Sequence, residues 1–314
     1  MQFEERALSF DCGGDCLFGV ASVPAQPAER GVVVVVGGPQ YRGGSHRQFT
    51  LLARHLAAQG IAVLRFDYRG MGDAEGEQRD FEMVQDDLRC AIDCFQAAVP
   101  AVREVVLWGL CDGASAALFY AAHDARVQGV VLLNPWVRTE GGLAKATLKH
   151  YYRDRLLQPE LWKKIFTGQF NYGAALRSFT GLLGAASGKA ADPASPAAAA
   201  APAAEPAAPA ATAPPASVSA APVPRIADPD LPPLPGRMHD SLAAFQGKVL
   251  LILSGADLTA QEFRDAVKAS RPWQKLLAAP RVTQQELAQA DHTFSRRAWR
   301  DQVADWTGEW MRSW

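Results

Sequence analysis

The sequence of 314 residues has almost no excess charge and no long apolar run. It holds 32 Lys and Arg against 33 Asp and Glu, and it contains no basic block that would neutralise phosphates. No nucleic-acid partner is therefore expected. No apolar run approaches the length of a bilayer span, and the N-terminus, Met1-Gln2-Phe3-Glu4-Glu5-Arg6, lacks the basic and apolar regions of a signal peptide. We therefore expect a cytoplasmic protein without a membrane span.

Cysteine is also scarce, with five residues and hence an odd count. Cys12 and Cys16 flank a Gly-Gly turn, and Cys90 and Cys94 lie four apart on one predicted helical face. Neither pair has a set of His or Cys partners with zinc-finger spacing. These four residues are expected to be ordinary core or surface thiols in a reducing compartment. The sequence thus predicts no metal and no cofactor.

Hydrophobic residues make up 48% of the chain, enough for one large core plus an insertion. A leading hairpin over residues 6–23 precedes a regular alternation of buried strands and amphipathic helices. The expected strands are residues 31–36, 61–66, 105–110, 130–134, 248–254 and about 282–287, and the expected helices are residues 45–58, 81–98, 112–123 and 294–314. Such alternation predicts an α/β fold with a mostly parallel central sheet and helices on both faces.

The predicted core is split by an insertion. Residues 1–136 form its first part and residues 236–314 its second. Residues 137–183 carry aromatic and basic side chains in a helical pattern and are expected to form a cap over the sheet. Residues 184–235 are dominated by Ala and Pro, with too few large apolar side chains to offset the entropy of ordering them. They are expected to be a disordered linker.

The most informative segment is Gly109-Leu110-Cys111-Asp112-Gly113, which joins an apolar strand to a helix of small residues. A reactive side chain at the tip of such a sharp turn leaves no room for Cβ atoms two positions on either side. The segment is typical of a nucleophile elbow in which cysteine replaces the usual serine. The alternative is that Cys111 is a small core hydrophobe.

A thiol nucleophile needs a base, and the base needs an orienting acid. Asp257 directly follows the predicted strand 248–254, and His292 lies between the last predicted strand and the last helix. Nucleophile, acid and histidine therefore occur in the chain order of an α/β-hydrolase triad. Taken singly, Asp257 is more often a turn residue or a helix cap, and His292 is more often a surface histidine. Their joint occurrence with the elbow, in this order and spacing, favours the triad.

The glycine-rich loop after the first long strand, Gly37-Gly38-Pro39-Gln40, is where one oxyanion-hole donor is expected. Pro39 has no N–H and cannot serve. The predicted oxyanion hole consists of the backbone N–H groups of Gly38 and Asp112, with Gln40 as the substitute for Gly38. Arg42 and Arg47 in and after this loop have two interpretations, a structural role or binding of an acidic substrate group.

These motifs, together with Asp67-Tyr68-Arg69-Gly70-Met71-Gly72 and Asp291-His292-Thr293-Phe294-Ser295, resemble those of the α/β-hydrolase superfamily. The strings Gly-Gly-Pro-Gln-Tyr-Arg, Gly-Leu-Cys-Asp-Gly-Ala-Ser and Asp-His-Thr-Phe-Ser are most similar to the exosortase A system-associated hydrolase 1 proteins. That resemblance implies a bacterial protein encoded with exosortase and exopolysaccharide genes. The chain departs from the superfamily pattern at Asp73-Ala74 and in its Ala/Pro-rich tract.

Motifs and resemblance together predict a hydrolase of carboxylic esters, thioesters or lactones with a Cys111–His292–Asp257 triad. The expected partner is a small-molecule, lipid or sugar acyl substrate. An acyltransferase to a sugar or lipid-linked acceptor would use the same triad. A noncatalytic scaffold with this fold is a further alternative. The sequence carries no prediction of the oligomeric state.

Overall fold

The structure is a computed structural model that describes residues 2–38, 40–137 and 232–314. Within these ranges the chain forms one eight-stranded sheet in the order β1-β2-β4-β3-β5-β6-β7-β8. The strands are β1 (Phe3–Cys12), β2 (Asp15–Pro24), β3 (Arg30–Val35), β4 (Val63–Asp67), β5 (Glu104–Leu110), β6 (Val127–Leu133), β7 (Lys248–Ser254) and β8 (Val282–Leu287). The pairs β1/β2 and β2/β4 are antiparallel, and all other neighbours are parallel.

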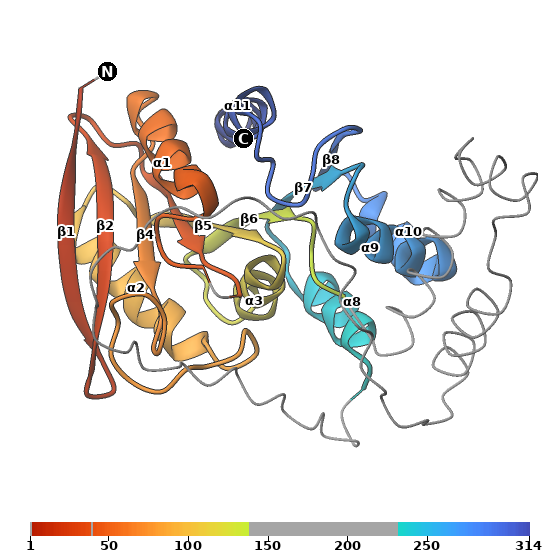
Figure 1. The fold of residues 1–314 in the computed structure, drawn as a ribbon, viewed down its shortest axis with the longest axis horizontal. Coiled ribbons are helices and arrows are strands. Elements are labelled where there is room, and N and C mark those ends of the chain that lie inside the picture. The colour runs from red at the N-terminus through yellow and green to blue at the C-terminus, as the bar shows by residue number, and fades with distance from the viewer. Residues whose placement is uncertain (1, 39, 138–231) are drawn as a thin grey trace, which may run out of the picture. The chain divides into compact units, whose positions relative to one another are not determined.

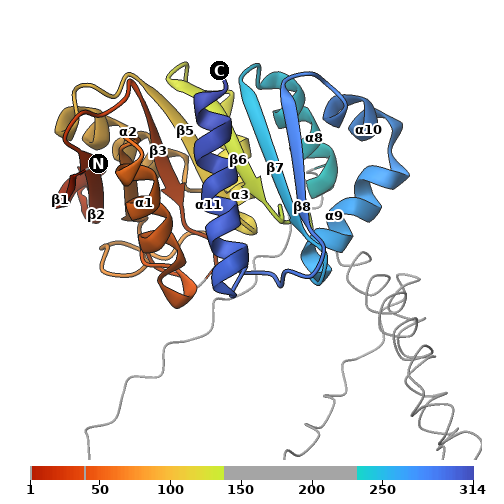
Figure 2. The same cartoon turned by 90° about the horizontal axis from the view of Figure 1, so that it is seen from above.

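Helices cover both faces of this sheet (Figures 1 and 2). Helices α1 and α11 pack together on one face, while α2, α3 and α8 lie on the other. The helical elements are η1 (Ser45–Arg47), α1 (Gln48–Ala58), α2 (Gln85–Ala98), α3 (Asp112–Ala121), α8 (Leu234–Ala244), α9 (Leu258–Ala269), α10 (Arg271–Leu277) and α11 (Arg297–Arg312). The predicted fold class, a mostly parallel sheet flanked by helices, is confirmed.

The central strands are apolar because helices bury them on both sides. Val32, Val33, Val34 and Val35 of β3 are completely buried, which explains a continuous β-branched run instead of an alternating one. β3 lies between β4 and β5 in the sheet. By contrast β1, at the edge, is exposed over residues 4–7 and alternates between half-buried and exposed only over residues 8–11.

Several predicted boundaries differ from the structure. The helix expected from residue 81 begins at Gln85, because residues 81–84 form a turn. The helix expected from residue 45 is divided at Arg47, where φ is positive, into η1 and α1. Residues 234 and 235, assigned to the linker, are the first residues of α8. The cap at 137–183, apart from residue 137, and most of the linker at 184–235 lie outside the described residues.

The described helices include none long and apolar enough to cross a membrane. The topology itself fixes where a site can form, because the carboxyl ends of parallel strands meet at one edge of a sheet. The parallel strands lie side by side in the spatial order β4, β3, β5, β6, β7 and β8. The loops that follow these strands therefore lie side by side.

Candidate active site

Cys111 occupies the tight turn between β5 and α3. Its φ of 61° and ψ of −125° are unusual for a residue other than glycine. A Cβ on Gly109 would collide with the backbone of Gly113, and a Cβ on Gly113 would come within 2.5 Å of the Val35 carbonyl oxygen. Both glycines are therefore required by the close approach of strand, turn and helix. The strained turn sets the half-buried Cys111 at the first turn of α3.

Asp257 and His292 are in contact. His292 Nδ1 lies 3.0 Å from Asp257 Oδ2, the latter on a side chain only 8% exposed. Asp257 is also the N-cap of α9, accepting hydrogen bonds from the N–H groups of Thr259 and Ala260. Burial raises the pKa of Asp257, but the His292 hydrogen bond and charge and the two N–H donors outweigh it, so that its pKa is lowered. The helix-cap interpretation and the acid interpretation are thus both compatible with this residue.

The same sheet edge brings these residues together with Cys111. Cys111 follows β5, Asp257 follows β7 and His292 follows β8, and only β6 separates β5 from β7. Burial raises the pKa of Asp112, the residue next to Cys111, and the charge of His292 acts in the opposite direction. His292 therefore interacts electrostatically with the elbow as well as with Asp257.

Asn134, which the sequence analysis did not single out, joins three of these segments. It follows β6, has a positive φ of 42°, and is completely buried. Its side chain donates to Ser254 Oγ (2.8 Å) and to the His292 carbonyl (3.0 Å), and it accepts from the Ser254 N–H (2.9 Å). The only signal in the sequence is a polar residue that ends an otherwise apolar strand.

The predicted oxyanion donors are already engaged. The Gly38 N–H donates to Asp112 Oδ2 at 2.6 Å, and the Gly113 N–H donates to Asp112 Oδ1 at 3.1 Å. The N–H of Gln40, the substitute donor, lies 3.3 Å from the Gly37 carbonyl oxygen. In this structure a carboxylate thus occupies the Gly38 N–H, one of the two donors assigned to the oxyanion hole.

Of the two loop arginines, Arg42 has a structural role. Its guanidinium pairs with the buried Asp67 and with Asp73, the second contact at 2.6 Å, and its N–H also donates to Asp67. These contacts tie the glycine-rich loop to the end of β4. Arg47 lies at the start of α1 with a positive φ of 61°.

The other cysteines are not in contact in the pairs that their sequence spacing suggests. Cys12, at the end of β1, and Cys90, on α2, have sulfur atoms 2.8 Å apart. Burial, followed by the neighbouring Cys90, raises the pKa of Cys12 to about 12. In the described part of the chain, no group of three or more His, Cys, Asp or Glu side chains is placed to hold a metal ion.

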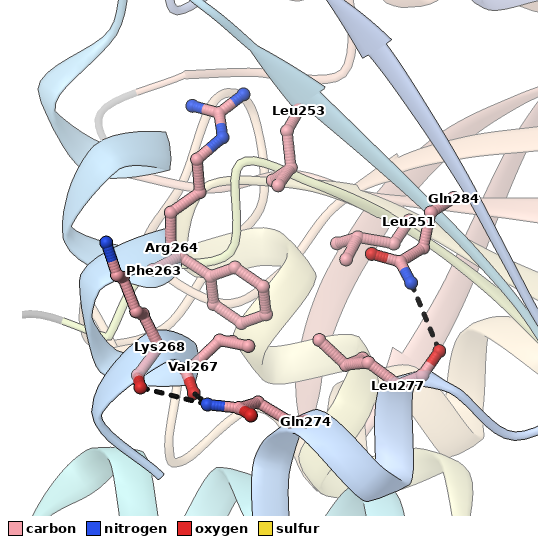
Figure 3. A pocket seen from close by; sticks show the side chains of 9 residues that line it. All are labelled: Leu251, Leu253, Phe263, Arg264, Val267, Lys268, Gln274, Leu277 and Gln284. Atoms are coloured by element: carbon pink, nitrogen blue, oxygen red, sulfur yellow. Dashed lines mark hydrogen bonds between the residues drawn. The ribbon is translucent and has the colours of Figure 1, made fainter. Parts of the chain in front are cut away.

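A pocket of about 380 Å³ lies between β7, α9 and α10, behind the helix that Asp257 caps (Figure 3). It is lined by five apolar side chains together with Arg264, Lys268, Gln274 and Gln284. Arg264 pairs with Glu286 at 2.8 Å. None of Cys111, Asp257 and His292 lines this pocket. It is therefore separate from the candidate active site.

The model of the serine aminopeptidase S33 family matches residues 27–163. Two curated proteins match shorter segments. The quorum-quenching protein AidA of Acinetobacter baumannii is 33% identical over 103 residues, which are 30% of this chain and 33% of AidA. The polyketide transferase grgF of a Penicillium species is 34% identical over 95 residues, 29% of this chain and 32% of grgF. The match thus spans about a third of the length of each relative.

Solved structures resemble the chain over nearly its whole length. An esterase of Pyrococcus furiosus has a TM-score of 0.60 at 14% identity, covering 99% of this chain and 93% of its own. A dienelactone hydrolase of Anabaena variabilis has a TM-score of 0.55 at 16% identity, covering 100% and 99%. Est1E of Butyrivibrio proteoclasticus, with ferulic acid bound, has a TM-score of 0.56 at 14% identity and 98% coverage of both chains. The protein has the α/β-hydrolase fold.

Proposed function

We propose that this protein hydrolyses a carboxylic ester, thioester or lactone with Cys111 as the nucleophile. The observation that carries the proposal is the Asp257–His292 contact at the sheet edge where β5 ends in Cys111. A strained elbow, an imidazole near it and a buried carboxylate behind the imidazole are the parts that nucleophilic acyl transfer requires. The esterase and the dienelactone hydrolase among the structural neighbours support the same class of reaction.

In the proposed mechanism, His292 takes the thiol proton of Cys111, and the thiolate attacks the acyl carbon. Asp257 holds the imidazole by its Nδ1 atom, which leaves Nε2 for proton transfer. The carbonyl oxygen gains negative charge in the tetrahedral intermediate, for which the N–H groups of Gly38 and Asp112 are the proposed donors. His292 then protonates the leaving group and activates the water that releases the acid from the thioester.

Acyl transfer is the second candidate function. The matched relative grgF is named a polyketide transferase, and a thioester at Cys111 can pass its acyl group to an alcohol as well as to water. The strings shared with the exosortase-associated proteins support an acceptor or substrate in exopolysaccharide synthesis. A noncatalytic scaffold would instead have an unreactive Cys111.

One experiment separates these functions. The protein is incubated with a panel of aryl esters and acyl thioesters, with and without sugar acceptors, and both free acid and acylated sugar are quantified. Intact-protein mass spectrometry then identifies any acyl adduct, and peptide mapping assigns its position. Free acid with an adduct on Cys111 supports the hydrolase, and acylated sugar supports the transferase. The absence of any adduct or turnover across the panel would contradict both.

A further inference from the structure

The Asp112 side chain lies in an anion site built from backbone. Its carboxylate accepts hydrogen bonds from the N–H groups of Gly38 and Gly113, at 2.6 and 3.1 Å. The N–H groups of Gly38 and Asp112 are the two proposed for the oxyanion hole. One of these two donors, the Gly38 N–H, is therefore taken by a carboxylate of the chain itself.

The contact between the Gly38 N–H and Asp112 Oδ2 resembles that of an oxyanion-hole donor with its oxyanion. Donors that stabilise a developing oxyanion lie about 2.7–3.1 Å from its oxygen, and a carboxylate oxygen carries a similar charge. The loop is also shaped around this side chain. A Cβ at Gly37 would collide with Asp112 Oδ1, and Gly38 has a φ of 55°, in the left-handed region that favours glycine. Gly37 therefore leaves room for the carboxylate, and Gly38 allows the left-handed turn beside it.

We propose that the Asp112 side chain is a gate that occupies the Gly38 donor of the oxyanion hole in the resting protein and leaves it when the carbonyl oxygen of an acyl substrate enters. The inference rests on the proposed function, because it takes Cys111 acylation as the reaction that the gate controls. Asp112 thus has two parts with opposite effects: its N–H stabilises the oxyanion, and its carboxylate competes with that oxyanion for the Gly38 N–H.

The surroundings of Asp112 favour its release. Burial raises the pKa of Asp112 in spite of the hydrogen bonds from Gly38 and Gly113, so the carboxylate gains solvation when it rotates outward. Two titratable groups face it. The charge of His292 attracts it, whereas Tyr68 is a buried neighbour whose own pKa is raised by burial and then by the charge of Asp112.

The test compares two reactions of the same thiol. Acylation of Cys111 by p-nitrophenyl acetate passes through an oxyanion, whereas alkylation by iodoacetamide displaces a halide at a saturated carbon and forms none. Both require the thiolate, so the ratio of the two rates cancels any effect of Asp112 on Cys111 ionisation. Both rates are measured by peptide mass spectrometry in the full chain, for the wild type, Asp112→Ser and Asp112→Asn.

We expect the ratio of acylation to alkylation to rise about tenfold or more in Asp112→Ser, because one oxyanion donor alone affects such reactions by about 10²–10³. Asp112→Asn should raise it less, because its amide oxygen remains an uncharged acceptor. Asp86→Asn, which removes an exposed carboxylate on α2, is the matched control and should leave the ratio unchanged. Melting temperatures establish that each variant is folded, and Asp112→Asn decides the result if Asp112→Ser is not.

Two outcomes overturn the gate. A ratio that falls in both Asp112 variants means that the carboxylate braces the Gly37–Gly38 loop for catalysis, and a ratio within twofold of the wild type means that it does not compete. In both cases wild-type acylation of Cys111 leaves the proposed function standing. If Cys111 is alkylated in all variants but acylated in none, the proposed function fails, and the gate fails with it.

Discussion

Two cysteine environments in this protein contrast in topology and in chemistry. Cys111 stands at the carboxyl edge of the parallel part of the sheet, where the loops after β5, β6, β7 and β8 converge. Cys12 ends β1 of the antiparallel hairpin, is 2% exposed, and faces the thiol of Cys90 on α2. The first thiol shares its sheet edge with an imidazole and a carboxylate, whereas the second contacts another thiol.

This contrast indicates that burial and neighbouring groups determine how readily a thiol forms the reactive thiolate. Desolvation and an adjacent thiol both disfavour the thiolate of Cys12, which is the reactive form of any cysteine. Cys111 begins a helix, where the positive end of the helix dipole favours the thiolate, and it shares its sheet edge with His292. The parallel topology brings together chemical groups that are far apart in the chain.

The largest effect on activity is expected when the proposed nucleophile is removed. Cys111→Ala should lower kcat for small esters by about 10⁴-fold or more, because the loss of a catalytic nucleophile removes the covalent route. Cys12→Ala is the matched control and should retain wild-type kcat. Steady-state kinetics on p-nitrophenyl acetate measure both. An active Cys111→Ala protein, or loss of activity in a folded Cys12→Ala or Cys90→Ala protein, would refute the assignment of Cys111.

The next effect concerns the base. His292→Ala should lower kcat by about 10²–10⁴-fold, the usual contribution of general acid–base catalysis. It should also slow iodoacetamide alkylation of Cys111 at about pH 7 toward the rate of an ordinary thiol, while Cys12 stays slow in both proteins. Peptide mass spectrometry follows the two cysteines in one sample. Unchanged Cys111 alkylation in His292→Ala would count against an activated nucleophile.

A smaller effect is expected at Asn134, a positioning residue at the sheet edge. Asn134→Ala removes the donors to Ser254 Oγ and to the His292 carbonyl, and leaves both acceptors buried. We expect about 1–3 kcal/mol lower free energy of unfolding. We also expect about tenfold lower kcat, because a small misplacement of the His292 loop is costly to catalysis.

Ser254→Ala sharpens this result, because it removes only one of those contacts and keeps the backbone N–H that donates to Asn134. The decrease in kcat should be clearly smaller in Ser254→Ala than in Asn134→Ala. Urea denaturation and steady-state kinetics, run on both variants, separate the structural effect from the positioning effect. Equal loss of stability in both variants with unchanged kcat in Asn134→Ala would assign Asn134 a structural role alone.

The sequence predicted those parts of the fold that depend on local pattern. The apolar run at residues 248–254 coincides with β7, and the apolar run at residues 31–36 lies within one residue of β3. The helix boundaries were less accurate, because α1 and α2 begin after turns whose conformation depends on tertiary contacts. Helices α9 and α10, divided at Ser270, were not predicted.

For the candidate site, the sequence supplied residue types and their order after strands, and these suffice to nominate Cys111, Asp257 and His292. It did not supply side-chain directions. The role of Asn134 depends on contacts with Ser254 and with the His292 carbonyl, which are 120 and 158 residues away in the chain. Likewise, only the folded loop places the Asp112 carboxylate on the Gly38 N–H.

The smallest expected effect is the pH dependence of stability due to Asp257. In the folded protein its pKa is lowered from the ordinary value of 3.8, where burial is outweighed by the His292 hydrogen bond and charge and by the N–H donors of α9. The folded state therefore releases the proton more readily than the unfolded chain. The resulting stabilisation is present above the unfolded pKa and is lost as the pH falls through the folded pKa.

Asp257→Asn should therefore lower the free energy of unfolding by about 1 kcal/mol near neutral pH, the order of the net contribution of one intramolecular hydrogen bond. This difference from the wild type should shrink as the pH falls below about 4, where the unfolded carboxyl group binds a proton. Urea denaturation at a series of pH values measures the difference directly. Asp86→Asn, whose carboxylate is exposed, should give a small difference that does not follow this course. A difference that stays constant or grows on acidification would show that the Asp257 carboxylate is not stabilised by His292 and the start of α9.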